Sequence, residues 1–174
     1  MRIFSKTNHR PGTAAFAKGQ DTISRILDKA FRLAVDEGFE KVTVRRIARE
    51  LGISPGNLSY YYASRSDLLD ALLDRVIEGY IAEFDRLRSE SRDSPEDQLC
   101  AVLGYVLDDL STPETTRFFP DLWQLASRDP KMSQRLDEMY RSYRLTLEEI
   151  IAQLCPSSDP RVHQDLALVI CGST

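Results

Sequence analysis

The chain has 174 residues, of which 42% are hydrophobic and 29% are charged, and its formal net charge is −4 at pH 7. This composition is ordinary for a soluble globular protein, and the length allows one or two compact modules. No apolar run approaches the roughly 20 residues of a membrane helix, and residues 1–20 lack the apolar core of a signal peptide, so we expect a cytoplasmic protein.

Positive charge is concentrated in the N-terminal third of the chain. Residues 1–62 contain 11 Lys and Arg against 6 Asp and Glu, whereas the remaining 112 residues contain 12 and 21. A basic module attached to an acidic body is typical of a DNA reader joined to a part that does not touch DNA. Residues 1–20 hold four basic residues and no acidic one. We expect a flexible arm there, which either reaches a DNA groove or is a passive tail.

Residues 21–37 are predicted to form the first helix. Its apolar side chains recur at helical spacing on one face, which consists of Ile23, Ile26, Leu27, Ala30, Phe31 and Ala34. Gly38 follows at the position where a left-handed residue ends a helix. We expect this helix to pack across the two short helices that follow, which gives a three-helix unit over residues 21–66.

The next segment has the pattern of two short helices joined by a tight turn. Thr43 is an N-cap, and the apolar face of the helix that it starts consists of Val44, Ile47, Ala48 and Leu51. Gly52 suits the left-handed residue of the turn. Ser54 caps the second helix, which starts at Pro55 and extends to about Tyr61. Two helices connected in this way form a helix-turn-helix, whose second helix enters the DNA major groove.

Polar side chains on this second helix are suited to contacting base edges and phosphates. They belong to Asn57, Ser59, Tyr60 and Tyr61, and they are flanked by Arg45, Arg46, Arg49 and Arg65. Residues 60–62 are consecutive tyrosines, and each step along a helix turns the side chain by about 100°, so they cannot all face inward. We expect Tyr62 to lie in the core and the other two tyrosines to be exposed.

A dense pattern of residues surrounds this motif. It consists of Gly38-Phe39, Thr43, Ile47-Ala48, Gly52-Ile53-Ser54, Gly56, Leu58, Tyr61-Tyr62, Ser64-Arg65 and Leu68. Over about residues 22–70 the chain thereby resembles the TetR family, the tetracycline-repressor-like transcriptional regulators. The resemblance implies an all-α fold in which a three-helix helix-turn-helix DNA-binding domain is joined by a long helix to a helical domain for effector binding and dimerisation, here residues 67–174. It also implies a homodimeric, ligand-responsive regulator, most often a repressor, that reads a roughly palindromic operator.

Roles on DNA follow from the residue types together with this resemblance. The expected contact set is Thr43, Arg45, Ser54, Gly56, Asn57, Ser59, Tyr60, Tyr61 and Arg65. Asn57 and Ser59 are expected to contact base edges, and the arginines and tyrosines mostly phosphates. The family usually has Tyr at the position of Ser59, which predicts a changed base preference. It also leaves a second hypothesis open, in which the helix-turn-helix is a degenerate scaffold and the helical body binds another protein.

The rest of the chain also reads as helical. Ser64 and Asp67 form a near capping box that starts a long helix, with apolar positions as far as Leu87. This helix is too long to serve the N-terminal unit alone, so we interpret it as the connector into the second domain. Polar breaks and helix-starting prolines then predict helices over about residues 95–110, 118–125, 130–154 and from 159 onward. No strand pattern occurs anywhere.

A homodimer is implied by the resemblance, because the last two helices of each TetR subunit form a four-helix bundle across a two-fold axis. Here these helices are about residues 130–154 and 159–174. Family members commonly run some tens of residues longer. The last helix is therefore expected to be short, either naturally or because the C-terminus is truncated, which would weaken the dimer.

Several aromatic and apolar residues of the second domain are candidates for lining the effector pocket that the resemblance implies. They are Tyr80, Phe84, Tyr105, Phe119, Trp123, Met139 and Tyr143. The alternative is that they form ordinary hydrophobic core. No Lys or Arg is isolated within these apolar segments, which predicts a small, largely apolar effector, although Arg117 and Arg128 flank them and leave a carboxylate or acyl group open. Acidic runs such as Asp108-Asp109 are interpreted as solvated helix faces.

No residue pattern indicates an enzyme, a cofactor or a metal site. The two histidines, His9 and His163, are far apart, and neither a Gly-rich phosphate loop nor a nucleophile motif occurs. Cys100, Cys155 and Cys171 show no metal or redox spacing, and an odd number of cysteines fits a reducing cytosol. Each of them lies in an apolar stretch, so we predict that they are small buried side chains.

Overall fold

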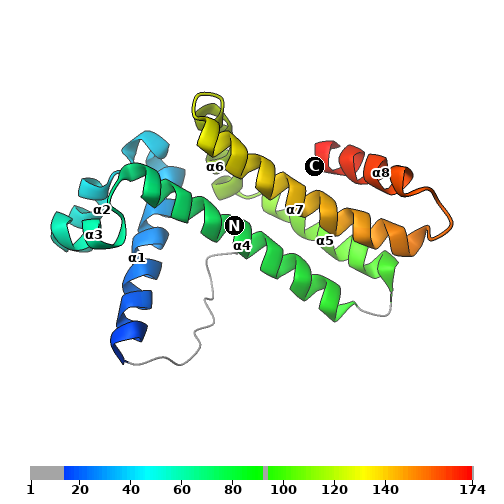
Figure 1. The fold of residues 1–174 in the computed structure, drawn as a ribbon, viewed down its shortest axis with the longest axis horizontal. Coiled ribbons are helices and arrows are strands. Elements are labelled where there is room, and N and C mark those ends of the chain that lie inside the picture. Colours follow the sequence, from blue (N-terminus) through cyan, green and yellow to red (C-terminus); the bar gives the residue numbers. More distant parts are fainter. Residues whose placement is uncertain (1–13, 92–93, 174) are drawn as a thin grey trace.

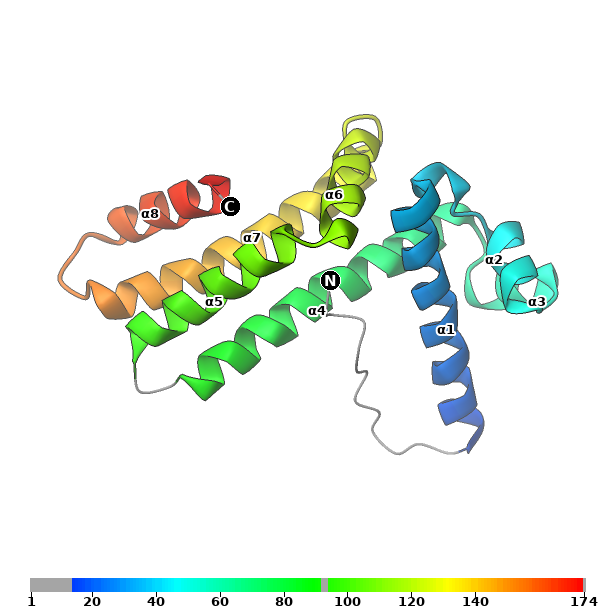
Figure 2. The same ribbon diagram turned by 180° about the vertical axis from the view of Figure 1, so that it is seen from behind.

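The computed structural model describes residues 14–91 and 94–173, and within these ranges the chain is helical and has no strand (Figure 1). Its helices are α1 (Ala14–Glu37), α2 (Val44–Leu51), α3 (Pro55–Tyr61), α4 (Arg65–Glu90), α5 (Pro95–Leu110), α6 (Pro113–Ala126), α7 (Pro130–Leu154) and α8 (Pro160–Ser173), with a short 3₁₀ helix, η1 (Phe39–Lys41), after α1. The helices α4, α5 and α7 run side by side, and α8 lies along the outer side of α7 (Figures 1 and 2). The expected all-α fold is confirmed.

The first helix is longer than expected, because α1 begins at Ala14 and not near Asp21. It therefore includes the last part of the segment that is expected to be a flexible arm. The remainder of that segment, residues 1–13, lies outside the described residues, so the arm stays a prediction there. The end of α1 at Glu37 is as predicted, since Gly38 has a φ of 88°, which side-chain-bearing residues rarely adopt.

Capping residues define the helix-turn-helix as predicted. The Thr43 hydroxyl accepts a hydrogen bond from the N–H of Arg46 at 3.2 Å and starts α2. Gly52 ends α2 in the left-handed region, with a φ of 66°. Ser54 then accepts from the N–H of Asn57 at 3.2 Å, and a proline begins α3. Each polar cap stabilises its helix by about 1 kcal/mol, so local interactions set the bounds of both helices.

The N-terminal helices and the C-terminal helices share one hydrophobic core. Phe118 of α6 is fully buried, and its ring centroid lies 5.2 Å from that of Phe31 in α1 and 5.0 Å from that of Phe39 in η1. Leu122 continues this face of α6 one turn later and belongs to the same buried cluster as Leu58 of α3. The chain therefore divides into two parts along its sequence, but α6 packs the second part directly onto the first.

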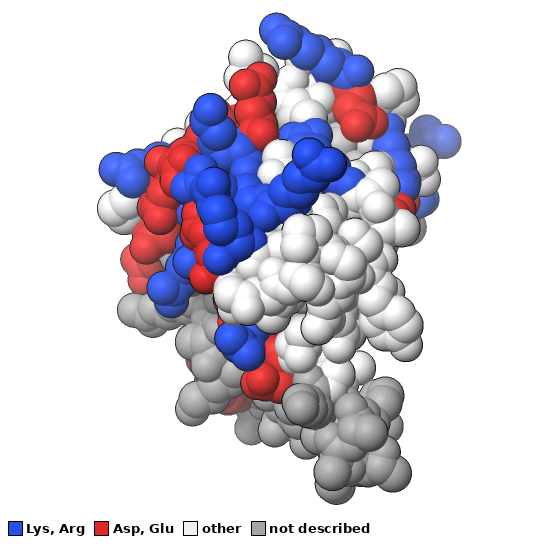
Figure 3. Space-filling model, turned by 90° about the vertical axis from the view of Figure 1, so that its left-hand side faces the viewer, with Lys and Arg blue, Asp and Glu red and all other residues white. Residues whose placement is uncertain are grey.

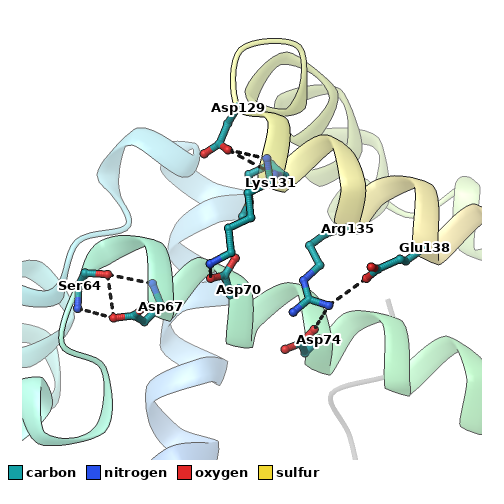
Figure 4. A network of polar contacts seen from close by, with 9 residues as sticks. Ser64, Asp67, Asp70, Asp74, Asp129, Lys131, Arg135 and Glu138 are labelled. Atoms are coloured by element: carbon teal, nitrogen blue, oxygen red, sulfur yellow. Dashed lines mark hydrogen bonds and ion pairs between the residues drawn. The ribbon is translucent and has the colours of Figure 1, made fainter.

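Ion pairs join α7 to α4 beside this core (Figure 4). Lys131 pairs with the buried Asp70. Arg135 pairs with Asp74 at 3.2 Å and with Glu138 at 2.9 Å. The predicted capping box at the start of α4 is also present. The N-terminal turns of α7 are thus held against the first half of α4, which leads out of the helix-turn-helix.

The cysteines contradict their prediction. Cys100 and Cys155 are exposed, and Cys171 is half-buried. Cys155 is the C-cap of α7, where the chain leaves the helix bundle. An apolar segment does not decide which way a single small residue faces, because burial depends on the neighbouring helices. Separately, none of the helices in the described ranges combines the length and the apolar composition that spanning a membrane requires.

We predict that Phe118→Ala lowers the free energy of unfolding by about 3–5 kcal/mol, because it removes a fully buried ring between two parts of the core. Urea denaturation followed by circular dichroism measures the change. Leu107→Ala on α5 is the matched control, since Leu107 is 53% exposed and its loss should change stability by less than about 0.5 kcal/mol. Equal effects of the two substitutions would contradict the role of Phe118.

Candidate functional site

The helix α3 presents a polar face to solvent. Asn57 and Ser59 are exposed, and the Tyr60 side chain is 85% exposed. On the opposite side, the fully buried Leu58 anchors α3 in the shared core. Gly56 is also exposed, and a methyl group at its Cα would meet no atom within 4 Å. Packing within the chain therefore does not require a glycine there, and the exposed start of α3 is left unobstructed.

The exposure of the three consecutive tyrosines differs from the expectation. Tyr60 is exposed as predicted, and Tyr62 packs partly against the core. Tyr61 is also half-buried against this core, which corrects the expectation that it is exposed. The reason is its position three residues after Leu58, which returns its side chain toward the buried side of the helix. Its ring meets that of Tyr60 edge-on at 5.4 Å, so Tyr61 supports the exposed ring.

Basic residues of α2 flank this face. Arg45 and Arg49 are exposed and take part in none of the ion pairs of the described residues, whereas Arg46 pairs with Glu37 and Glu50. Figure 3 views the end of the molecule where α2 and α3 lie, and it shows Lys and Arg side chains gathered beside an uncharged surface. Positive charge next to an exposed polar helix is suited to attracting a phosphate backbone.

Arg65 has a structural role that the sequence does not reveal. Its Nε donates to the carbonyl of Val42 at 3.0 Å, and its Nη2 donates to the carbonyl of Phe39 at 2.8 Å. The guanidinium therefore ties the start of α4 to the segment that precedes α2, and the interpretation of Arg65 as mainly a phosphate contact is revised. The hydroxyls of Thr43 and Ser54 likewise accept capping hydrogen bonds within the chain.

A cavity of about 460 Å³ lies between α4, α5, α6, α7 and α8, within the size range of small-molecule sites. Most of the predicted pocket residues line it, namely Tyr80, Phe84, Phe119, Trp123, Met139 and Tyr143. Tyr105 does not line it but lies behind the wall, with its ring centroid 6.2 Å from that of Tyr80 and 6.1 Å from that of Phe84. The aromatic residues therefore form the lining of a cavity and not only a core.

A carboxylate in the cavity wall was not apparent in the sequence pattern. Asp109 is only 6% exposed, and its Oδ2 accepts hydrogen bonds from the hydroxyls of Tyr80 at 2.6 Å and Thr115 at 2.9 Å. Burial, together with this carboxylate, raises the pKa of Tyr80 above its usual value, so the hydroxyl keeps its proton. The interpretation of Asp108-Asp109 as a solvated pair holds for Asp108 and is wrong for Asp109. The available signal was its position three residues after Val106, on the same helix face.

The cavity also contains a guanidinium, which contradicts the expectation of apolar segments free of Lys and Arg. Arg144 of α7 is half-buried and lines the wall beside Cys171, and its charge acts to lower the pKa of that thiol against the effect of burial. Nearby, Nε1 of Trp123 donates to the Tyr140 hydroxyl at 3.0 Å. The flanking Arg117 and Arg128 do not line this cavity; both are exposed.

Comparisons with known proteins agree with this arrangement. The family model described as bacterial regulatory proteins, tetR family, matches residues 26–72, which include α2 and α3. The model described as BetI-type transcriptional repressor, C-terminal, matches residues 95–170, which include part of the cavity wall. The two matches follow one another along the chain in the order of the two parts of the fold.

Individual relatives extend over most of the chain. An uncharacterised helix-turn-helix-type transcriptional regulator from the dhlA 5′ region of Xanthobacter autotrophicus is 33% identical over 150 residues, covering 84% of this chain and 73% of that protein. The regulator BetI of Stenotrophomonas maltophilia is 25% identical over 141 residues, covering 79% and 68%. A transcriptional regulator from Saccharomonospora viridis, solved in complex with choline, has the same fold, with a TM-score of 0.65, 23% identity and coverage of 88% and 83%. The chain therefore belongs to the TetR family of bacterial regulatory proteins and is a helix-turn-helix transcriptional regulator.

Proposed function

We propose that the protein is a homodimeric repressor that binds a roughly palindromic operator and releases it when a small organic cation enters the cavity. The observation that carries the DNA-binding part is the polar face of α3, exposed beside the guanidiniums of Arg45 and Arg49, which form no ion pair with any residue that the structure describes. In this proposal residues up to 66 read DNA, and residues 67–174 bind the effector and the second subunit. The effector is drawn from the cytoplasm, where the operator lies.

The exposed residues of α3 divide the work on DNA. Asn57 and Ser59 contact base edges, because their short polar side chains project from the exposed face. Tyr60 and Arg45 hold phosphates, which position the helix without reading sequence. Ser59 reaches less far than the tyrosine that is usual in the family, so base preference differs while backbone contact is kept by its neighbours.

An apolar stripe on α8 supports the homodimer. Val162, Leu166 and Val169 lie at spacings of three and four residues and are 44%, 43% and 64% exposed. Monomeric proteins rarely leave such a contiguous apolar patch in water. The helix α8 lies at the outer edge of the molecule, along α7, so a second copy can cover both helices (Figures 1 and 2). A dimer also doubles the DNA sequence that the short α3 helices read.

The chemistry of the cavity favours a cationic effector. Aromatic rings attract organic cations through their negative faces, and rings of Tyr80, Phe84 and Phe119 surround this space. The buried carboxylate of Asp109 adds a negative charge in the same wall. The choline complex of the Saccharomonospora viridis regulator shows that a relative of this fold binds such a cation. We therefore narrow the expected effector from largely apolar to an organic cation with an apolar body.

Two helices connect the cavity to the DNA-reading part. The helix α6 contributes Phe119 to the cavity and Phe118 to the packing against α1 and η1. The helix α4 contributes Tyr80 to the cavity and continues directly from the helix-turn-helix. A ligand that binds one arrangement of these helices more tightly shifts the population toward it, and only as far as this difference in affinity allows.

We predict that Arg45→Ala weakens DNA binding on every sequence and lowers the slope of log affinity against log salt by about 1, because one phosphate contact is lost. Asn57→Ala instead changes which bases are preferred, by about 1–3 kcal/mol at the contacted position. Fluorescence anisotropy on duplex DNA from upstream of the protein's own gene, with competitor DNA and at several salt concentrations, measures both. Arg117→Ala, on the exposed side of α6, is the control.

Equal losses on all sequences for the Arg45 and Asn57 variants would refute the division of labour. A wild-type protein that binds no DNA at low salt would refute the repressor and favour the protein-interaction scaffold.

We predict that Val169→Asp converts the dimer into a monomer, because it places a charge in the apolar stripe of α8. Sedimentation velocity measures the mass, and operator affinity should fall with it. Arg161→Asp, near the start of the same helix, is the control for added negative charge. Monomeric wild-type protein at micromolar concentration would rule out this interface.

We predict that Asp109→Asn lowers the affinity for choline by about tenfold or more, because the amide keeps the shape but not the charge. Trp123 is the single tryptophan of the chain and lines the cavity, so its fluorescence reports binding directly. Asp108→Asn is the matched control, since Asp108 is adjacent and exposed. Identical choline titrations for the two variants would show that Asp109 does not contact the cation.

A further inference from the structure

Two opposite charges lie in the wall of the same cavity. Asp109 enters from α5, next to Tyr80 of α4 and Thr115 of α6. Arg144 enters from α7, next to Cys171 of α8. Within the described residues these two side chains do not form an ion pair with each other. A cavity with a positive and a negative charge in its wall suits a different kind of ligand from a cavity that has a single carboxylate among aromatic rings.

Arg144 is compensated only weakly within the chain. Among the described residues, no carboxylate forms an ion pair with it, whereas Arg135 on the same helix pairs with Asp74 and Glu138. The thiol of Cys171 lies beside it, and burial raises the pKa of that thiol, which therefore stays neutral. A thiol is a weak hydrogen-bond acceptor. A guanidinium held in this way is complemented by a carboxylate, which its planar N–H groups bind in two parallel hydrogen bonds.

The size of the cavity is in accord with a ligand that has more than one polar group. A volume of about 460 Å³ lies within the range of sites that hold organic ligands larger than a single small cation. A small cation placed against Asp109 leaves much of this space unfilled. A ligand that extends from Asp109 toward Arg144 removes more water from the apolar wall and compensates both charges.

We propose that the effector is amphoteric, with a cationic group against Asp109 and the aromatic rings and a carboxylate paired with Arg144. This inference rests on the proposed function, because it adds a second group to the organic cation. The aromatic lining favours a quaternary ammonium over a primary one, since methyl groups on nitrogen contact ring faces and need no hydrogen-bond acceptors. Arg144 is then the residue that sets specificity for the anionic end.

The test compares two probe series by the fluorescence of Trp123. One series consists of ω-trimethylammonio carboxylates of increasing chain length, and the other of ω-trimethylammonio alcohols of the same lengths. Wild-type protein should bind the best carboxylate about tenfold or more tighter than the matching alcohol. Arg144→Gln should abolish this preference by weakening the binding of the carboxylates, and Arg144→Lys should keep part of it. Arg141→Gln, at an exposed position on α7, is the control and should behave as wild type.

The outcomes separate this inference from the proposal on which it rests. If the alcohols bind and weaken operator binding, but the carboxylates show no preference in wild-type protein, the cationic effector stands and the amphoteric one is overturned. A carboxylate preference that survives Arg144→Gln, with folding verified by circular dichroism, overturns the role of Arg144. If no probe of either series binds, both this inference and the cationic effector of the proposed function are wrong.

Discussion

The packing of Phe118 between Phe31 and Phe39 is the contact on which the arrangement of this regulator depends. A helix-turn-helix of this size has little core of its own, and here the missing apolar surface is supplied by α6. The next residue of α6, Phe119, and Trp123 one turn later line the cavity. One helix therefore completes the core around the helix-turn-helix and forms a wall of the cavity in which we propose that the effector binds. Close-packed interiors transmit small displacements because they leave few voids to absorb them.

The polar contacts around this core fix the relative orientation of the helices more than they raise the free energy of unfolding. Solvent-accessible ion pairs such as Arg135–Asp74 contribute about 0–1 kcal/mol each, which is small beside the burial of the aromatic core. They do fix how the helices lie, since Arg135 reaches Asp74 of α4, and Arg75 of α4 reaches Asp28 of α1 at 2.7 Å. The helix α4 is thus linked by charge to the cavity helices on one side and to α1 on the other. Its position is set by directional contacts, which a modest movement of α7 is able to change.

Features that depend on neighbouring residues along the chain, such as caps and turns, are predicted correctly from the sequence. Features that depend on neighbours in space, such as the burial of a single side chain, are not. Thr43, Gly52 and Ser54 define the helix-turn-helix through contacts within three or four residues, so the predicted caps and turn are confirmed. Asp109 and Arg144 are of residue types that usually lie on the surface, and only the packing of five helices places them in one cavity. The exposed cysteines and the half-buried Tyr61 are errors of the same kind, because the direction of one side chain depends on which helices pack beside it.

In the function that we propose, the charged groups of the cavity couple its occupancy to DNA binding. Burying a carboxylate and a guanidinium costs free energy. A ligand that compensates these charges gains most when they are at one particular separation. Asp109 and Arg144 lie on α5 and α7. These helices pack against α4, which follows the helix-turn-helix in the chain, and against α6, which packs against α1 and η1. The affinity of the ligand therefore depends on the relative positions of the helices that also set the position of α3. By linkage, the arrangement that binds the ligand best is the one that the ligand populates, and an operator that requires a different arrangement loses affinity by the same factor.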